Sequence, residues 1–231
     1  MADALLLEWE DVLVHTRAWR AHALARALEE ERLPPFVAGA VTEGVTDDLD
    51  VERRVGEALA RTGRQDDHTL HAIVLLRARR AFAERLAQGV SLVPGGADFI
   101  ASCESRVRVV IVTGAARTET EQLVRQAHWD AAVTSIVAAD DVNSGGGWND
   151  QVARALEQLA RRGIARAADV VMLGSSVAAF RAARSLGVRT VAVGAPAHVS
   201  VEADGAVSSL VGQAFDDIAA LARSIAAPGT R

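Results

Sequence analysis

Two periodicities of apolar residues divide this chain into a helical part and a strand-forming part. From residue 17 to residue 91 the apolar positions recur at the spacing of an α-helix. The helices expected there span residues 17–31, 51–62 and 69–88. Pro34 ends the first helix, and Gly63 and Gly89 stand where the other two should stop. No strand pattern interrupts this block, so the sequence predicts that it is all-helical.

The rest of the chain alternates short apolar runs with helical segments. The runs are rich in β-branched residues and almost wholly apolar, as buried parallel strands are. The expected strands are residues 5–7, 107–112, 132–138, 170–173 and 190–193, with helices over 118–126, 149–162 and 177–186 between them. This alternation predicts an α/β fold built on a doubly wound parallel sheet. Because one strand precedes the helical block, the block is an insertion after the first strand.

We therefore expect an α/β core made of residues 1–16 and 92–231, and a helical cap made of residues 17–91. Sheets of this kind bind ligands outside the carboxyl ends of their strands. Those ends carry Glu8 and Glu10, Thr113 and Gly114, Asp140 and Asp141, and Ser175 and Ser176. The sequence predicts that these polar residues lie at one edge of the sheet.

Composition excludes several classes of function. A chain of 231 residues that is 50% hydrophobic can bury a full core. A net charge of −5 and a pI near 5.7 argue against a nucleic-acid or membrane-surface partner. No apolar run approaches the ~20 residues of a membrane span, and the N-terminus lacks the features of a signal peptide. The single Cys103 rules out an internal disulfide and fits a reducing cytoplasm, so we expect a cytoplasmic protein.

The chain contains no lysine, since all 25 of its Lys and Arg residues are arginines. A mechanism that requires a lysine ammonium group therefore cannot operate in this protein. Arginine is not an equivalent substitute, because its charge is spread over a planar guanidinium with a fixed geometry.

The segment from Leu7 to Thr16 resembles the first motif of the haloacid dehalogenase-like (HAD) hydrolases, in the subfamily of β-phosphoglucomutase. That motif is Asp-x-Asp-Gly-x-Leu-x-Asp-Ser/Thr. Glu8 stands in the place of the nucleophilic Asp, and Glu10 in the place of the acid/base Asp. Asp11 replaces the Gly and His15 the last Asp. The frame of the motif is kept, but its reactive residues are changed.

The resemblance extends over almost the whole chain. The helical insertion stands where the family has its helical cap, and Pro94-Gly95 match the return to the core. Thr113-Gly114 match the second motif, in which the hydroxyl and the following backbone N–H groups hold phosphate oxygens. A threonine that caps the next helix would explain this pair equally well. The resemblance implies a HAD-like core with a helical cap.

The last two motifs lack their charged residues. Gly146 falls on the position of the third-motif Lys, although Asp150 matches the Asp that follows it. In the fourth motif, Ser175 replaces a metal-binding Asp. In the family, an Asp carboxylate attacks phosphorus while Mg²⁺ and the Lys neutralise the charge. The longer Glu8 side chain displaces the attacking oxygen by about 1 Å or more, which can cost on the order of 100-fold in rate.

These losses together argue against conventional phosphatase or phosphomutase activity, and we expect no metal and no cofactor. The dehalogenase branch of the superfamily works without metal. It also needs the nucleophilic Asp, a Lys, and an Asn at the position of Val177. The sequence therefore argues against dehalogenase activity as well.

Three hypotheses remain for the function. The first is a metal-independent enzyme that uses Glu8 and Glu10 as general acid and base. It would dehydrate, isomerise or cyclise a small molecule held in the cleft between core and cap. The substrate-binding residues would be Thr113, Gly114, Ser175 and Ser176. The second is a non-catalytic HAD-like protein that binds a ligand or a protein partner, and the third is a weak phosphatase with Glu8 as nucleophile.

Overall fold

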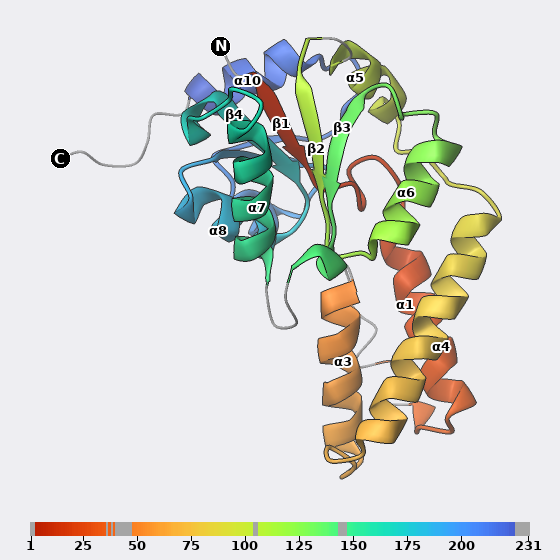
Figure 1. The fold of residues 1–231 in the computed structure, drawn as a ribbon. Coiled ribbons are helices and arrows are strands. Elements are labelled where there is room, and N and C mark those ends of the chain that lie inside the picture. The colour runs from red at the N-terminus through yellow and green to blue at the C-terminus, as the bar shows by residue number, and fades with distance from the viewer. Residues whose placement is uncertain are drawn as a thin grey trace. The chain divides into compact units, whose positions relative to one another are not determined.

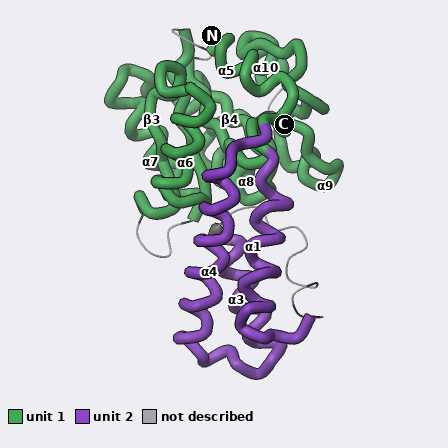
Figure 2. Tube along the Cα trace, turned by 90° about the vertical axis from the view of Figure 1, so that its right-hand side faces the viewer, with its two compact units in different colours: residues 1–14, 92–231 green, residues 15–91 purple. Residues whose placement is uncertain are grey.

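A computed structural model describes residues 3–35, 37, 39, 48–103, 106–142 and 147–224 of the chain (Figure 1). The chain forms two compact units, shown in different colours in Figure 2. Unit 1 consists of Met1–Val14 and Leu92–Arg231, and unit 2 consists of His15–Ser91. Gly146, which falls on the position of the family's Lys, lies outside the described residues.

Unit 1 is built on a six-stranded sheet in the order β3-β2-β1-β4-β5-β6. The strands are β1 (Ala4–Leu7), β2 (Arg108–Val112), β3 (Val133–Val137), β4 (Val170–Gly174), β5 (Arg189–Val193) and β6 (Gly205–Val207). All neighbouring strands pair in parallel. The doubly wound α/β fold and the first five strands predicted from the sequence are thus confirmed. The sixth strand was not predicted, because three residues are too short to show a period.

Helices lie between the strands of unit 1 along the chain, and one more follows the last strand. They are α5 (Gly96–Cys103), α6 (Arg117–Gln126), α7 (Trp148–Ala160), α8 (Val177–Ser185), α9 (Ala197–Ser200) and α10 (Phe215–Ser224), with short 3-10 turns at Ala139–Asp141 and Ala167–Asp169. The predictions of α6, α7 and α8 are confirmed to within a few residues at each end. Helices α5, α9 and α10 were not predicted from the sequence.

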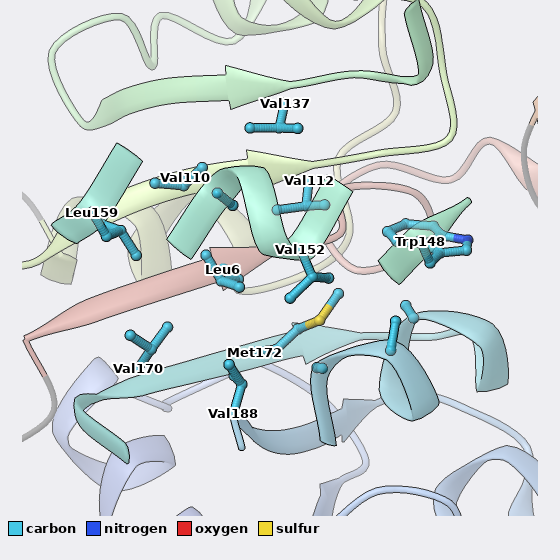
Figure 3. Close-up of a cluster of buried hydrophobic side chains, with 14 of the residues drawn as sticks. Leu6, Val110, Val112, Val137, Trp148, Val152, Leu159, Val170, Met172 and Val188 are labelled. Carbon is cyan, nitrogen blue, oxygen red and sulfur yellow. The ribbon is translucent and has the colours of Figure 1, made fainter. Parts of the chain in front are cut away.

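The core of unit 1 explains why β1 occupies the middle of the sheet. Leu6 pairs with Val110 of β2 on one side and with Met172 of β4 on the other. These side chains meet Val152 of α7 in one buried cluster (Figure 3). Every residue of β1 is fully buried, as an all-apolar central strand requires.

Unit 2 is the helical cap. Its described helices are α1 (Arg17–Glu30), α3 (Asp48–Arg61) and α4 (His68–Ala87), which confirm the three helices predicted from the apolar spacing. Leu24, Leu28, Leu59 and Val74 belong to their shared core. Gly63 and Gly89 follow α3 and α4 with φ values of +70° and +115°, left-handed conformations that favour glycine and end a helix. None of the described helices combines the length and apolar composition that crossing a membrane requires.

Candidate functional site

The chain turns sharply after β1, immediately beyond the carboxyl end of the strand. β1 ends at Leu7, and the N–H of Leu13 donates to the carbonyl of Trp9 at 3.0 Å. Asp11 has a φ of +54° at the position where the family motif has Gly, and aspartate tolerates this left-handed conformation better than most residues. The turn comprises residues 11–13, and Glu10 precedes it in an isolated bridge to Val14. Trp9 is fully buried.

Glu8 connects the end of β1 to the turn between β4 and α8. Its backbone N–H donates to the carbonyl of Leu173 at 2.9 Å, which extends the pairing of β1 with β4 by one residue. Its Oε2 accepts hydrogen bonds from the backbone N–H groups of Ser175 at 2.7 Å and Ser176 at 3.1 Å. The side chain is 1% exposed. The buried carboxyl group of Glu8 is thus directed at backbone donors.

Glu10 makes the corresponding connection to the end of β2. The Oγ1 of Thr113 lies 2.8 Å from Oε1 of Glu10 and 3.0 Å from its Oε2. The same hydroxyl accepts a hydrogen bond from the N–H of Ala115 at 3.0 Å. Gly114, between them, is also buried. The threonine hydroxyl therefore bridges Glu10 to the loop that follows β2.

The structure gives the two serine hydroxyls partners within the chain. Ser175 Oγ donates to the backbone carbonyl of Glu10 at 3.1 Å. Ser176 is the N-cap of α8, and its Oγ accepts from the N–H of Ala179 at 3.3 Å. The structure thus brings Glu8, Glu10, Thr113, Gly114, Ser175 and Ser176 to one edge of the sheet. Their polar side-chain groups bond to the protein itself.

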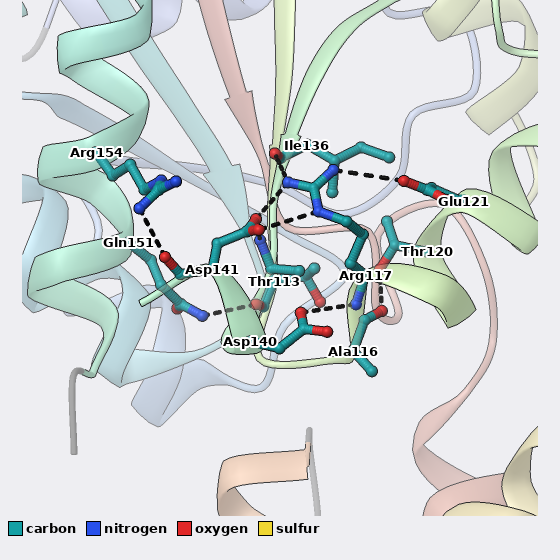
Figure 4. A network of polar contacts seen from close by, with 11 residues as sticks. Thr113, Ala116, Arg117, Thr120, Glu121, Ile136, Asp140, Asp141, Gln151 and Arg154 are labelled. Atoms are coloured by element: carbon teal, nitrogen blue, oxygen red, sulfur yellow. Dashed lines mark hydrogen bonds and ion pairs between the residues drawn. The ribbon is translucent and has the colours of Figure 1, made fainter. Parts of the chain in front are cut away.

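Two residues that the sequence did not single out support this edge of the sheet. Gln151 of α7 is fully buried, and its Nε2 donates to the carbonyl of Thr113 at 2.8 Å. Arg117 begins α6, four residues after Thr113, and its Nε donates to Oδ1 of Asp141 at 3.0 Å (Figure 4). These partners are 38 and 24 residues apart in the chain, so no local pattern could have revealed them.

The Arg117–Asp141 pair anchors the loop after β3. Nη2 of Arg117 donates to the other carboxylate oxygen of Asp141 and, at 2.8 Å, to the carbonyl of Ile136. The N–H of Ala138 donates to Oδ2 of Asp141 at 2.8 Å. Burial alone would raise the pKa of the Asp141 carboxyl. The bonds from Arg117 and Ala138 outweigh it and leave that pKa below its usual value. The guanidinium group of Arg117 at this edge of the sheet is therefore already paired with the carboxylate of Asp141.

The cap has a concave surface of its own between α1 and α4. The groove has a volume of about 430 Å³ and is lined by Arg26, Ala27, Glu30, Leu76, Arg77, Arg80, Ala81 and Glu84. Its arginines pair with acidic residues of the same surface: Arg77 with Glu30 at 2.7 Å, and Arg80 with Glu84 at 2.9 Å. The charges of the groove are thus largely balanced within the cap.

Comparisons with known proteins agree with this architecture. The β-phosphoglucomutase of Clostridium difficile superposes with a TM-score of 0.78 at 11% sequence identity, over 97% of this chain and 98% of that protein. CbbY from Rhodobacter sphaeroides, in complex with phosphate, superposes with a TM-score of 0.69 at 20% sequence identity, over 94% of this chain and 99% of that protein. YfnB from Bacillus subtilis, bound to magnesium, superposes with a TM-score of 0.65 at 17% sequence identity, over 96% of this chain and 99% of that protein. At these identities the likeness shows the fold.

No curated protein gives a significant sequence match to the chain. A family model does: the one described as haloacid dehalogenase-like hydrolase matches residues 5–187, most of the chain. The matched range contains Glu8, Glu10, Thr113 and Ser175. The chain therefore belongs to the haloacid dehalogenase-like hydrolases.

Proposed function

We propose that this chain is a non-catalytic member of the haloacid dehalogenase-like family that has lost Mg²⁺-dependent phosphoryl transfer. The proposal rests above all on Glu8, the residue in the place of the nucleophile. Its Oε2 is held by the N–H groups of Ser175 and Ser176 at 2.7 and 3.1 Å. A nucleophilic oxygen must face the phosphorus in line with the leaving group. This oxygen faces backbone donors instead, which supports a structural role for the side chain.

The residues at the strand ends do not fit a Mg²⁺ ion. Mg²⁺ binds near-octahedral sets of oxygen ligands that normally include one or two carboxylates. Ser175, in the place of the metal-binding Asp, is neutral, and its hydroxyl donates to the carbonyl of Glu10. Within the part of the chain that the structure describes, no group of three or more His, Cys, Asp or Glu residues is arranged to hold a metal.

The charge on a transferring phosphoryl group also needs a cation, and such electrostatic stabilisation is a large part of catalysis. The chain has no lysine. Arg117, which follows the phosphate-binding motif, is held by both carboxylate oxygens of Asp141. The Arg117 side chain thus binds the loop after β3 rather than a phosphoryl group, which supports the proposal.

The metal-independent acid/base enzyme is the second candidate. It is favoured by the fact that both Asp positions of the first motif keep a carboxyl group beside the carboxyl end of β1. A general acid or base must reach its substrate directly or through one water. Glu8 and Glu10 are 1% and 2% exposed and bond to the ends of β4 and β2, so the geometry favours a structural role.

Turnover assays on the full chain separate these functions. The substrates are p-nitrophenyl phosphate and small sugar phosphates, with Mg²⁺ or with EDTA, and Glu8→Gln is the matched control. We expect the wild type to release no more phosphate than Glu8→Gln under either condition. Mg²⁺-dependent release that Glu8→Gln abolishes would overturn the proposal in favour of the weak phosphatase. Metal-independent turnover of an unphosphorylated substrate that Glu8→Gln abolishes would favour the acid/base enzyme.

A restored motif tests the metal separately. The variant Glu8→Asp with Ser175→Asp returns two carboxylate ligands to the family's positions. Since a ligand that binds the folded state raises the melting temperature, we expect Mg²⁺ to stabilise this variant and not the wild type. An equal shift in both proteins would contradict the proposed loss of the metal site.

A further inference from the structure

Helix α4 of the cap carries apolar side chains on two of its faces. One face packs into the cap at four-residue spacing and consists of Leu70, Val74, Ala78, Phe82 and Leu86. Ile73 and Leu76 lie outside that buried stripe and are 37% and 69% exposed. A surface helix normally presents polar residues on its outward face. The cap's own core therefore does not explain the second apolar face of α4.

This face borders a groove between α1 and α4, which lie side by side in the cap (Figure 2). Leu76 lines the groove of about 430 Å³ described above, together with the small side chains of Ala27 and Ala81. Ala81 and Glu84 also line a second hollow of about 240 Å³, which extends to Trp19. Because the two hollows share lining residues, they form one continuous groove along the pair of helices.

The charges along the groove are of both signs. Three arginines and three glutamates form ion pairs there: Arg26, Arg77, Arg80, Glu30, Glu31 and Glu84. Such a mixed surface does not attract a nucleic acid or an anionic membrane. The net charge of −5 makes two copies of the chain repel each other, and a surface of mixed charge is where that repulsion is weakest. The charges therefore favour a partner that carries the same mixture.

We infer that the α1–α4 face of the cap binds a second copy of this chain in a two-fold symmetric dimer. A two-fold dimer buries the same patch on both chains, so the patch must be complementary to itself. Here the exposed side chain of Leu76 stands beside a groove lined by Ala27 and Ala81, and Leu76 of each chain fills the groove of the other. The guanidinium of Arg85 stacks 4.1 Å from the ring centre of Trp19, and arginine and tryptophan often dominate the binding energy of interfaces.

The size of the face indicates how stable the dimer should be. From Ile73 to its last residue, Ala87, α4 runs for about 21 Å, and two helices side by side are about 20 Å wide. A face of these dimensions belongs to the small class of specific interfaces, whose complexes are transient. We therefore expect a dimer that dissociates reversibly on dilution.

Sedimentation velocity of the full chain, from high to low micromolar concentration, tests the inference. The wild type should pass from dimer to monomer on dilution. Leu76→Glu places a charge in the apolar contact and should raise the dissociation constant by about tenfold or more. Val201→Glu is the matched control, because Val201 is 77% exposed but belongs to unit 1, and it should associate as the wild type does.

Three results of this experiment would overturn the inference. A wild type that is monomeric even at high micromolar concentration would leave the face to a different protein. Leu76→Glu that dimerises as tightly as the wild type would place the contact elsewhere on the chain. Equal losses in Leu76→Glu and Val201→Glu would show an effect of added charge rather than of this face.

Trp19 reports on the same contact without any change at Leu76. Trp9, Trp129 and Trp148 are buried, so Trp19 is the one of the chain's four tryptophans that a dimer at this face would shield from water. Dilution of the wild type should therefore shift the tryptophan emission to longer wavelength, in step with dissociation. Trp19→Phe should show no such shift. Dissociation without an emission change, or a shift that persists in Trp19→Phe, would contradict the proposed interface.

Discussion

A Cβ atom on residue 174 would lie 2.6 Å from Oε2 of Glu8, much closer than non-bonded atoms approach. Gly174→Ala should therefore displace either the carboxyl group or the end of β4. We expect it to lower the free energy of unfolding by about 1–3 kcal/mol, the usual cost of overpacking a core. Chemical denaturation measures this change directly.

Gly56→Ala is the control for that prediction. Gly56 lies in α3, and apart from its chain neighbours and the backbone of its own helix, a Cβ there would meet no atom within 4 Å. Since alanine is the better helix former, this change should be neutral or stabilise the protein by up to ~1 kcal/mol. Equal effects of the two substitutions would show that the contact with Glu8 does not restrict position 174.

The hydroxyl group of Thr113 should contribute more to the free energy of unfolding than its methyl group. Thr113→Val keeps the shape of the side chain but removes the donor to Glu10 and the acceptor for Ala115. Losing hydrogen bonds between buried polar groups costs about 1–3 kcal/mol of unfolding free energy. Thr113→Ser keeps the hydroxyl and should retain most of the stability in urea denaturation. If the two variants were equally stable, the hydroxyl would have no structural role.

The fold was largely predictable from the sequence because its signals are local. An apolar run such as Leu5–Leu7 and the helical spacing of the cap each depend on only a few neighbouring positions. The elements that were missed are short, as β6 is, or depend on small residues, as α10 does with its buried Ala219 and Ala222.

The site was predictable only in its location. Parallel strands bring their carboxyl ends to one edge, so Glu8, Thr113 and Ser175 could be placed together from the strand order alone. Which oxygen meets which donor depends on packing between segments far apart in the chain. The bond from the Ser175 N–H to Glu8 spans 167 residues, and no spacing rule could reveal it.

Cys103 should behave as an inert, buried thiol. It is fully buried in α5, and burial raises the pKa of its thiol to about 11. At pH 8 only about one molecule in a thousand would carry the reactive thiolate, against roughly a quarter for a free cysteine. A disulfide reagent such as DTNB should therefore react slowly with the native protein and rapidly in denaturant. Cys103→Ser provides the blank, and equal rates in the two states would contradict the burial of the thiol.

The Arg117–Asp141 pair should make the free energy of unfolding depend on pH in the acid range. Because the pKa of Asp141 is lowered in the folded state, the pair stabilises the fold above the unfolded-state pKa of about 3.9. That contribution is lost as the pH falls through the lower, folded-state pKa. Arg117 is partly exposed, so Asp141→Asn is expected to cost only about 1 kcal/mol at neutral pH. The difference between this variant and the wild type should shrink steadily in urea denaturation below about pH 4.

Arg117→Gln is the matched background for this measurement, because it removes the side-chain cation that holds down the pKa of Asp141. In that background Asp141→Asn should have much less effect at neutral pH, since interacting partners give non-additive changes in stability. The Ala138 N–H would remain as a donor to the residue at position 141 in either case. A difference between wild type and Asp141→Asn that stays constant from neutral to acid pH would mean that the carboxylate does not stabilise this edge of the sheet through its charge.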